Sequence, residues 1–311
     1  MSEIKIIISG VSSFSGAHFA YQMLEEGFEV YGFSRNVSDW TSEQDARIRW
    51  IRKKFPEFQI FDLVELNKIS HLEISAILLH GGVTLDYRNK SFDVQAAVKE
   101  SLEVNEILMS YFPKAAIMQT GTFSEPDESS GEYPRSSFNP YSTSKALIWQ
   151  ELKKRYSSKR KMAKYVMPNP FGPLESKRFT DYLLKSWAQK LVPEISFPFH
   201  VRDNVPIDLL RLHYSESVKR FLNDEKRSIF YPSKYPETVL AFAERYSREI
   251  SKRSNLQLQL KIKLNSEYIE PIVRVNSEPC EWTVKNWNEN LSWNYIVFDA
   301  LERINAYSVI V

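Results

Sequence analysis

The first half of the chain alternates short apolar runs with stretches of helical apolar spacing. Residues 4–9 read Ile-Lys-Ile-Ile-Ile-Ser, a run rich in β-branched side chains that predicts a buried strand. A turn with a glycine at each end, residues 10–16, follows directly, and apolar residues then recur at helical spacing through Leu24. The opening of the chain therefore predicts a strand, a glycine turn and a helix in immediate succession.

Similar patterns continue along the rest of the chain. Residues 29–33 predict the second strand, and short apolar runs follow at 58–61, 76–79 and 115–118. Helix-like apolar spacing is found at residues 94–112, 141–156, 180–190, 209–222, 237–250 and 298–304. Residues 256–264 alternate apolar and polar side chains, as a half-buried strand does. The sequence shows no internal repeat and no low-complexity linker between these segments.

The glycine turn has a physical consequence for ligand binding. Backbone without β-carbons can turn sharply and approach a pyrophosphate, which then sits at the positive N-terminal end of the helix. Gly10 and Gly16 occupy the outer positions, but Ser13 stands in the middle, where it would either displace the phosphates or bind them through its hydroxyl. Because all nine glycines lie between Gly10 and Gly172, we expect the first half of the chain to hold a cofactor.

A tyrosine and a lysine stand four residues apart near the start of one helical stretch. This spacing places Tyr141 and Lys145 one turn apart on the same helix face. The lysine ammonium then favours the ionised form of the phenol. A tyrosine held in this way can exchange a proton with a carbonyl or an alcohol near neutral pH, so the pair is a candidate catalytic centre.

Composition excludes several classes of protein. A chain of 311 residues, 43% hydrophobic and 26% charged, can bury a sizeable core. The net charge of +2 indicates no particular class of partner. The basic clusters at 153–155 and 159–161 are typical of a solvated helix face, not of a nucleic-acid-binding surface. We expect a cytoplasmic protein, because the chain shows no membrane span and no secretory signal, and its lone Cys280 fits a reducing compartment. The five histidines lack the short paired spacing of zinc ligands, so no metal site is expected.

Several short motifs follow one another in the order in which a known protein family carries them. In chain order they are the glycine turn at 10–16, Asp62-Leu63, His80-Gly81-Gly82, residues 119–122, Tyr141 with Lys145, residues 167–173 and residues 199–203. Together they resemble the extended short-chain dehydrogenase/reductase family, of the NAD-dependent epimerase/dehydratase type. Members of this family mostly act on nucleotide-linked sugars.

The resemblance implies an α/β fold and a division of the chain. Members have a Rossmann-type, doubly wound parallel sheet and a smaller C-terminal substrate-binding domain. We therefore expect an NAD(P)-binding domain over residues 1–170, to which segments near 200–230 return, and a mainly substrate-binding domain over 171–311. Family members usually dimerise through two helices per subunit, here 94–112 and 141–156, so a homodimer is expected.

The resemblance also assigns the cofactor site. The expected residues are Gly10, Ser12, Ser13, Phe14, Gly16, Ser34, Arg35, Asp62, Leu63, His80, Gly81, Gly82 and Lys145. The end of the second strand decides between the two cofactors, because an NAD enzyme places Asp or Glu there on the ribose hydroxyls. This chain carries Arg35 instead, which can pair with a 2′-phosphate. We therefore expect NADP, with NAD as the alternative.

By this resemblance the expected reaction is the reduction of a keto-sugar nucleotide by NADPH, in the supply of precursors for deoxysugars or polysaccharides. Tyr141 would donate the proton and Lys145 would hold the nicotinamide ribose. Thr122 would hydrogen-bond the carbonyl oxygen, with Thr120 and Ser124 as the alternatives for this role.

Dehydration fits the sequence less well. Dehydratases of the family carry an acidic pair directly after the catalytic threonine, whereas Phe123 and Ser124 follow Thr122 here and Glu125 is only third. The acid that expels water is therefore missing, and reduction needs no acid beyond Tyr141.

Substrate contacts are expected from both halves of the chain. The expected residues are Thr84, Ser124, Asn169, Lys177, Arg178 and Arg202. Many family members carry a diphosphate-binding arginine four residues before the later His-Val motif, but this chain has Ser196 there, and Arg202 is a candidate substitute. The pattern is loosely similar to CDP-sugar 4-reductases such as abequose or paratose synthase, and it leaves the base and the sugar open.

Two alternatives to the reductase remain. An NAD-dependent nucleotide-sugar epimerase would keep the cofactor bound and turn over without any added. A non-catalytic dinucleotide sensor would fit Ser13 and the missing arginine, but a sensor has no need of the Tyr141 and Lys145 pair.

Overall fold

Two compact units make up the chain. The computed structural model describes residues 4–35, 37–84, 89, 91–175, 178–223, 227–265, 270–282, 284–285 and 287–308. The described residues of the first unit come from Met1–Ser129, Tyr133–Met167 and Arg211–Tyr231, and those of the second from Ser130–Glu132, Pro168–Leu210 and Pro232–Val311. The chain therefore contributes Ser130–Glu132 to the second unit, enters it again after Met167, returns to the first for Arg211–Tyr231 and ends in the second.

A parallel sheet is the centre of the first unit. Its seven strands among the described residues are β1 (Lys5–Ser9), β2 (Glu29–Phe33), β3 (Ile60–Phe61), β4 (Ala76–Leu79), β5 (Ala116–Thr122), β7 (Met162–Met167) and β11 (Ile229–Phe230). They lie in the order β11-β7-β5-β4-β1-β2-β3, and every neighbouring pair is parallel. This doubly wound, Rossmann-type arrangement confirms the expected fold class.

The order of the strands identifies where a ligand can bind. The chain builds the sheet outward from β1 in one direction through β2 and β3, and in the other through β4, β5, β7 and β11. Ligands of open α/β sheets bind beyond the carboxyl ends of the strands at such a switch point. Here Gly10 follows β1 and His80 follows β4, so two expected site residues lie at this point.

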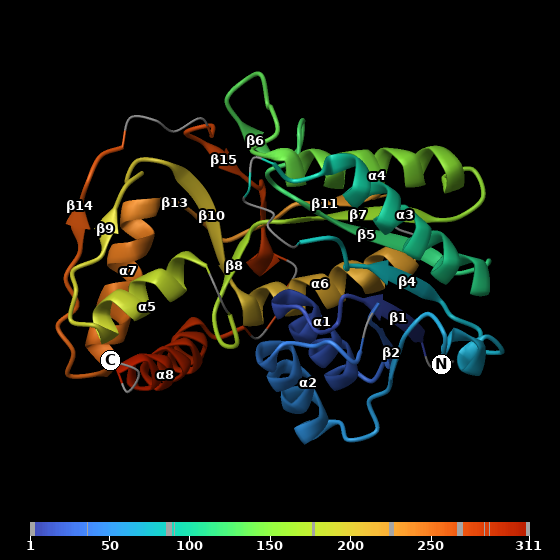
Figure 1. The fold of residues 1–311 in the computed structure, drawn as a ribbon, viewed down its shortest axis with the longest axis horizontal. Helices are drawn as coiled ribbons and strands as arrows, with labels where there is room; N and C mark the ends of the chain where they lie inside the picture. The colour runs from blue at the N-terminus through green and yellow to red at the C-terminus, as the bar shows by residue number, and fades with distance from the viewer. Residues whose placement is uncertain are drawn as a thin grey trace. The chain divides into compact units, whose positions relative to one another are not determined.

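Helices cover both faces of this sheet (Figure 1). They are α1 (Phe14–Glu25), α2 (Ser42–Lys54), α3 (Val94–Tyr111), α4 (Pro140–Tyr156) and α6 (Ile207–Leu222), with a 3-10 turn at Leu66–Ile69. On one face α1 and α6 meet in a stacked pair of rings, Phe19 and Tyr214, whose centroids are 3.9 Å apart, and α2 packs against α1. On the other face α3 and α4 lie side by side.

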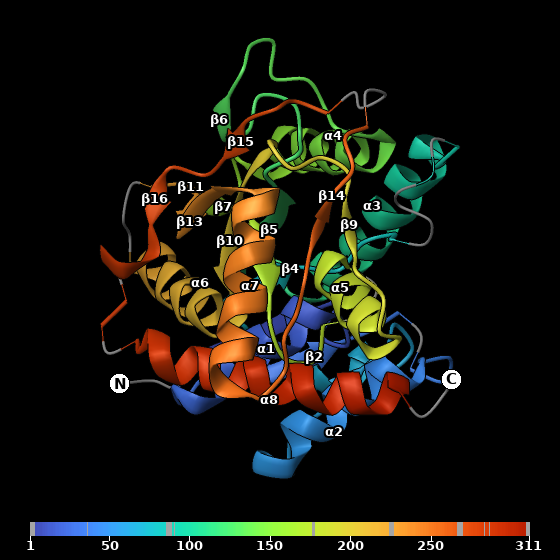
Figure 2. The same ribbon diagram turned by 90° about the vertical axis from the view of Figure 1, so that its left-hand side faces the viewer.

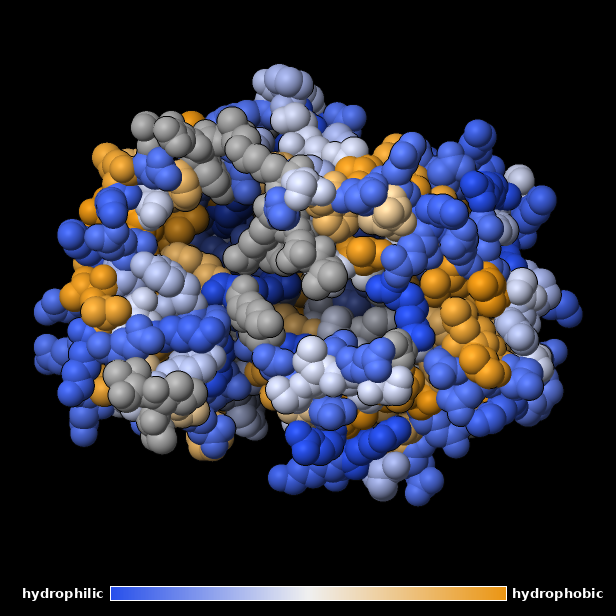
Figure 3. All heavy atoms as spheres, in the orientation of Figure 1, coloured by the Kyte–Doolittle hydropathy of each residue, from blue (hydrophilic) through white to orange (hydrophobic). Residues whose placement is uncertain are grey.

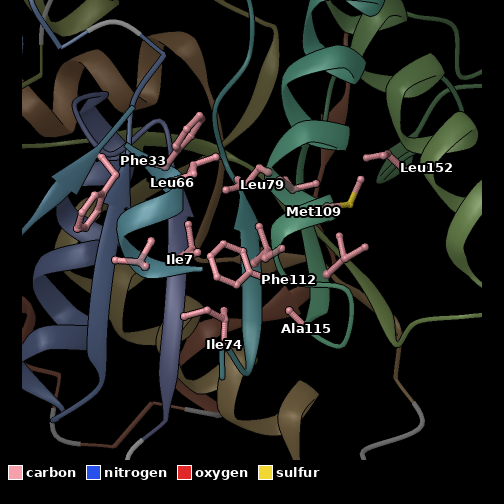
Figure 4. Packing of buried hydrophobic residues seen from close by; sticks show 14 of the residues in the cluster. Ile7, Phe33, Leu66, Ile74, Leu79, Met109, Phe112, Ala115 and Leu152 are labelled. Carbon is pink, nitrogen blue, oxygen red and sulfur yellow. The ribbon is translucent and has the colours of Figure 1, made fainter. Parts of the chain in front are cut away.

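The apolar runs of the sequence form the core of this unit. Ile7 on β1, Leu79 on β4, Met109 on α3 and Leu152 on α4 belong to one buried cluster, which Figure 4 shows between the sheet and the two helices. Because parallel strands are covered on both faces, they are continuously apolar, and all four residues of β4 are buried. Burial of such side chains provides most of the stabilisation of a sheet of this kind.

Short strands and three helices form the second unit. Its strands are β6 (Ser130–Gly131), β8 (Asn169–Phe171), β9 (Glu194–Ile195), β10 (Val201–Pro206), β12 (Pro232–Ser233), β13 (Tyr235–Thr238), β14 (Lys261–Ile262), β15 (Arg274–Val275) and β16 (Glu278–Pro279). The helices are α5 (Phe179–Ala188), α7 (Val239–Arg253) and α8 (Glu289–Ser308), with a 3-10 turn at Cys280–Trp282. Figure 2 shows these three helices near one another. Phe171, Phe242 and Trp293 are buried in a core to which all three helices contribute.

One predicted strand is much shorter than expected. The alternation over residues 256–264 predicts a half-buried strand, but only Lys261–Ile262 pairs, with β9, and both residues are exposed. Leu256 and Leu264 are exposed as well. Leu258 and Leu260 do pack against the core of the second unit, as the alternation implies. The strand itself was wrongly predicted for most of this segment, because a strand also needs a neighbouring strand to pair with.

The surface carries separate apolar patches on a mostly hydrophilic face (Figure 3). Ile107 on α3 and Leu147 on α4 are among the exposed large apolar side chains. Each of the two helices expected in a dimer thus presents an apolar residue, and the homodimer stays a prediction. Within the described residues, every helix is too short or too polar to cross a bilayer.

Candidate active site

The glycine turn packs backbone to backbone against the segment after β4. Gly10 has φ +68°, and a β-carbon there would lie 2.6 Å from the Cα of Gly81. The Gly81 amide in turn donates to the Ser9 hydroxyl at 2.9 Å. A β-carbon on Gly16 would lie 2.3 Å from the Gly10 carbonyl oxygen. The protein itself therefore requires these glycines, and they bring the ends of β1 and β4 together.

Ser13, in the middle of the turn, caps the first helix. Its hydroxyl accepts a hydrogen bond from the Gly16 amide at 3.1 Å, which satisfies one of the amides at the start of α1. A hydroxyl that accepts in this way still has its own proton to donate. The structure thus shows Ser13 as a helix cap, and both expected roles at the phosphates stay predictions. The neighbouring Phe14 is buried with its ring edge-on to His18.

Helix α2 holds the same turn from outside. Gln44 donates to the Ser12 hydroxyl at 3.1 Å, and the buried Arg47 donates to the Ser12 carbonyl at 3.2 Å. The sequence analysis missed both residues, because nothing in a helical pattern marks which polar side chain will turn back to an earlier loop.

His80 connects three elements of the site. Its Nε2 lies 2.9 Å from the hydroxyl of Ser15 on α1, and its Nδ1 lies 3.1 Å from the hydroxyl of Thr120 on β5. Burial, together with the nearby Lys145 ammonium, lowers the pKa of His80 to about 3. The imidazole is therefore neutral at physiological pH, so one ring nitrogen donates and the other accepts.

Tyr141 and Lys145 lie in the first turns of α4, as the spacing predicts. Asn139 caps this helix by accepting from the Ser142 amide, and Pro140 occupies its first position. The ring of Tyr141 meets the edge of Phe92, with centroids 6.0 Å apart. Lys145 is 5% exposed, and burial lowers its pKa to about 8.

Lys145 reaches the segment that follows β4. Its Nζ lies 3.8 Å from the position of a β-carbon on Gly82, which is van der Waals contact. The structure therefore brings Lys145 together with Gly82, and through Gly81 with the glycine turn.

The hydroxyls at the end of β5 belong to two separate groups. Thr120 is buried and bonded to His80. Thr122 is half-buried and lies 3.0 Å from the Ser124 hydroxyl, which lies 2.7 Å from that of Ser142, the neighbour of Tyr141. These hydroxyls link Thr122 and Ser124 to the start of α4, which favours either of them over Thr120 for the expected role, and the choice between Thr122 and Ser124 stays open.

A buried group of charges lies behind these hydroxyls. Lys164 on β7 contacts Glu125 at 2.5 Å and Glu128 at 2.6 Å, and the Tyr231 hydroxyl donates to Glu128 at 2.8 Å. Glu125 also accepts from the Thr122 amide at 2.7 Å. The sequence analysis considered Glu125 only as an acid that does not match the acidic pair of dehydratases. It missed Lys164, because no local motif pairs residues this far apart in the chain.

Arg35, at the end of β2, makes contacts within the protein that the sequence did not predict. Arg35 forms an ion pair with Glu100 on α3, and its guanidinium also donates to the Gly82 carbonyl at 3.4 Å. Burial lowers the pKa of Arg35. The neighbouring Ser34 hydroxyl accepts from Trp40 at 3.1 Å. A carboxylate therefore already neutralises the cation on which the NADP prediction depends.

The turn after β3 carries the two residues expected at the adenine, and this role stays a prediction. Asp62 accepts from the amides of Val64 and Glu65 at 2.9 and 3.1 Å, and Leu63 packs against the apolar core. Thr84, expected at the substrate, is exposed.

The expected substrate residues of the second unit lie close to β8 and β10. Asn169 begins β8, beside Asn204 of β10. Arg178 donates to the Pro170 carbonyl at 3.2 Å. Arg202 is buried, where it donates to the Val201 and Ile272 carbonyls and pairs with Glu270 at 3.0 Å. Lys177 lies outside the described residues, and the substrate roles of all four stay predictions.

The fold and the site together define a Rossmann-type protein with closely packed glycine loops at its switch point and a Tyr/Lys pair on α4. A family model, the NAD dependent epimerase/dehydratase family, matches residues 6–198, and the chain belongs to this family. This confirms the resemblance found in the sequence. No curated protein matches the chain.

Solved structures with the same fold cover nearly the whole chain. The UDP-glucose-4-epimerase of Stenotrophomonas maltophila, with bound NAD and formylated UDP-arabinopyranose, has a TM-score of 0.74 at 12% identity and covers 99% of this chain and 100% of its own. UDP-glucuronic acid 4-epimerase of Bacillus cereus, in complex with UDP-glucuronic acid and NAD, has a TM-score of 0.72 at 14% identity, covering 96% and 99%. ADP-L-glycero-D-manno-heptose-6-epimerase of Helicobacter pylori has a TM-score of 0.69 at 17% identity, covering 98% and 97%. At these identities the likeness shows the fold.

Proposed function

We propose that this protein is an NAD-dependent epimerase of a nucleotide-linked sugar. The family match and the whole-chain likeness to solved nucleotide-sugar epimerases support this function. One observation favours it over the NADPH-dependent reductase expected from the sequence: Glu100 already neutralises Arg35, so a 2′-phosphate would have to displace an existing ion pair.

The cradle fits a dinucleotide. Gly10, Gly16 and Gly81 leave the backbone at the switch point without side chains, and the Ser13 hydroxyl and the N-terminus of α1 suit a pyrophosphate. Asp62 and Leu63 would contact the adenine end, and Lys145, against Gly82, would hold the nicotinamide ribose. Bound there, NAD would supply a reversible acceptor and donor of hydride.

The residues of the chain handle the proton. Tyr141 Oη would take the proton of a sugar hydroxyl and later return it, and the Lys145 ammonium, protonated below about pH 8, would stabilise the negative charge on the phenol oxygen. Thr122 would hydrogen-bond the same substrate oxygen through its hydroxyl. His80 stays neutral and would keep Thr120 and Ser15 in place without exchanging protons itself.

A cofactor assay combined with a turnover assay tests this proposal. The purified protein should carry NAD, detectable by absorbance and by extraction. It should also convert a UDP-sugar to its epimer without added dinucleotide, as followed by proton NMR of the anomeric signals. If it epimerises none of a panel of UDP-, ADP-, GDP-, CDP- and dTDP-sugars while it holds NAD, the proposal is wrong.

A second candidate is the NADPH-dependent reductase of a keto-sugar nucleotide. It is favoured by the end of β2, where the sequence places Ser34 and Arg35 and has no carboxylate before Asp39. Fluorescence titrations with NADH and NADPH separate the two functions. Selective and reversible binding of NADPH would support the reductase, and retained NAD would support the epimerase.

A further inference from the structure

A buried ion cluster in the first unit has no part in the proposed reaction. It consists of Lys164, Glu125 and Glu128, whose side chains are 1%, 0% and 12% exposed. Lys164 lies between the two carboxylates, and Glu128 also accepts from the Tyr231 hydroxyl. The Lys164 ammonium also lies 5.7 Å from the centroid of the Trp149 ring on α4.

Stability alone gives no reason for such a cluster. Desolvating each ion costs several kcal/mol, and well-packed apolar residues of similar volume often serve a fold equally well or better. The backbone nevertheless makes room for it at Gly121, where a β-carbon would lie 2.4 Å from Lys164 Cε and 2.6 Å from Glu125 Oε1. The absence of a side chain at Gly121 in β5 therefore leaves room for the aliphatic part of the Lys164 side chain.

Glu125 reaches the proposed reaction centre by hydrogen bonds. Its Oε1 accepts from the Thr122 amide at 2.7 Å, while Oε2 is held by Lys164 at 2.5 Å. The Thr122 hydroxyl continues through Ser124 to Ser142, next to Tyr141 in the chain. One carboxylate thus fixes the end of the strand from which this series of hydroxyls leads to the start of α4.

Glu125 also acts on Lys145 through space. The charges that act on Lys145 come from two other elements, Glu125 after β5 and Lys164 on β7. Lys145 in turn lowers the pKa of His80 after β4, and Tyr141 lies one turn earlier on α4. Burial lowers the pKa of Lys145, the Glu125 charge raises it again, and the Lys164 charge lowers it. Of these groups, Glu125 is the one whose negative charge raises the pKa of Lys145 and so favours its protonated form.

We propose that Glu125 is a positioning residue of this site: clamped by Lys164, its carboxylate fixes the Thr122 end of β5 and provides a negative charge that stabilises the Lys145 ammonium. This inference deepens the proposed function and rests on it, because Lys145 and Thr122 act there. Burial raises the pKa of Glu125, and Lys164 counteracts this by charge and hydrogen bond while it holds the carboxylate in place. Glu128 binds the same ammonium.

The test is the titration of Lys145 in the protein without added ligand. Carbon-13 NMR of labelled lysine side chains, with the signal assigned through Lys145→Met, should give a pKa of about 8 in the wild type. Glu125→Gln keeps the shape and an acceptor for the Thr122 amide, and should lower this pKa by about one unit or more, because an attractive charge is lost. Adding Lys164→Met to this variant removes the repulsive charge as well and should return the pKa toward the wild-type value.

Glu151→Gln is the matched control. This acid lies on α4, where it pairs with Arg155 at the surface, so its removal should leave the Lys145 titration unchanged. An unchanged Lys145 pKa in folded Glu125→Gln would overturn the inference.

A second variant covers the case in which Glu125→Gln does not fold. Glu125→Leu with Lys164→Met removes the two charges together, which buried pairs tolerate better than the loss of one. Hydrogen exchange of the Thr122 amide should then speed up at least about tenfold, since its acceptor is gone. Unchanged exchange would equally overturn the inference.

These readouts need neither cofactor nor turnover. If the protein epimerises a sugar nucleotide but the Lys145 pKa is the same with and without the Glu125 charge, this inference alone is refuted. If the Lys145 pKa changes with Glu125 but the protein epimerises nothing, the proposed function alone is refuted.

Discussion

Two residues carry most of the proposed chemistry, and their environments differ. Tyr141 lies at the start of α4 against Phe92, while Lys145, one turn later, is almost fully buried against Gly82. A buried ammonium is destabilised relative to its neutral form, which is why its pKa falls from 10.5 to about 8. At neutral pH Lys145 is therefore still charged, but its titration lies close enough to be observed.

Dinucleotide affinity should depend on pH above neutrality. Because the folded-state pKa of Lys145 is about 8, its charge is present below that pH and lost as the pH rises through it. A hydrogen bond from a charged donor contributes about 1.5–3 kcal/mol, so NADH affinity should fall roughly tenfold or more between pH 7 and pH 9.5. Fluorescence titration across this range measures it. Lys145→Met should bind weakly and lose this pH dependence, and a variant with the same slope as the wild type would contradict the assignment.

Removing the Tyr141 hydroxyl should separate catalysis from binding. Tyr141→Phe keeps the ring against Phe92, so dinucleotide affinity should stay within about twofold, whereas turnover should fall by about 10² to 10⁴ with the proton-transfer group gone. Steady-state turnover and dinucleotide titration measure the two effects. Retention of most of the activity would refute the proposed mechanism.

At the scale of elements, the site depends on the contact between two loops. The turn after β1 and the segment after β4 meet at Gly10 and Gly81, and α1 begins from this junction with Ser13 as its cap. The cradle is therefore a property of how β1 and β4 pair, and a side chain at the junction would separate them.

Two glycine substitutions distinguish this contact from backbone strain alone. Gly10 and Gly27 both have positive φ, +68° and +80°, but a β-carbon meets Gly81 at the first and nothing within 4 Å at the second. Gly27→Ala should cost about 1–2 kcal/mol of unfolding free energy, and Gly10→Ala should cost a further 1–3 kcal/mol and weaken NADH binding. Urea unfolding and NADH titration measure both variants. Equal losses would mean that the loops can move apart without consequence.

At the scale of the whole molecule, buried neutral histidines make the fold sensitive to acid. His213 on α6 is buried beside the Tyr165 hydroxyl, 3.1 Å from its Nδ1. Burial lowers its pKa to about 3, and the charges of Arg227 and Arg220 contribute in the same direction. His80 lies in the same unit and its pKa is also about 3, so it is buried in the neutral form in the same way.

Unfolding free energy should therefore fall as the pH drops from about 6.5 to 3. The folded-state pKa of His213 lies below its ordinary value of 6.5, so the unfolded chain binds the proton first and is favoured across this window. Each pH unit corresponds to about 1.4 kcal/mol per histidine. Urea unfolding between pH 7 and pH 4 should show a shallower loss for His213→Asn than for the wild type. His71→Asn, at an exposed histidine, should behave as the wild type. Equal slopes for all three proteins would rule out His213 as a source of acid sensitivity.

The sequence by itself determined the features that lie within one element or one turn. The apolar runs at 4–9 and 76–79, the glycine turn and the Tyr141 and Lys145 spacing all predict local structure, because periodicity and backbone freedom act over a few residues. The family resemblance added the order of these motifs and, with it, the parallel sheet.

Only the tertiary structure decided how the site is assembled. The His80 contacts, the Arg35 and Glu100 ion pair and the Lys164 cluster join residues that lie 36 to 65 positions apart in the chain. Which charges meet depends on which strands are neighbours and where they end, and a hydrophobic pattern leaves that order open. For the same reason the alternation at 256–264 predicted a longer strand than the structure contains, since a β-strand forms only where another strand pairs with it.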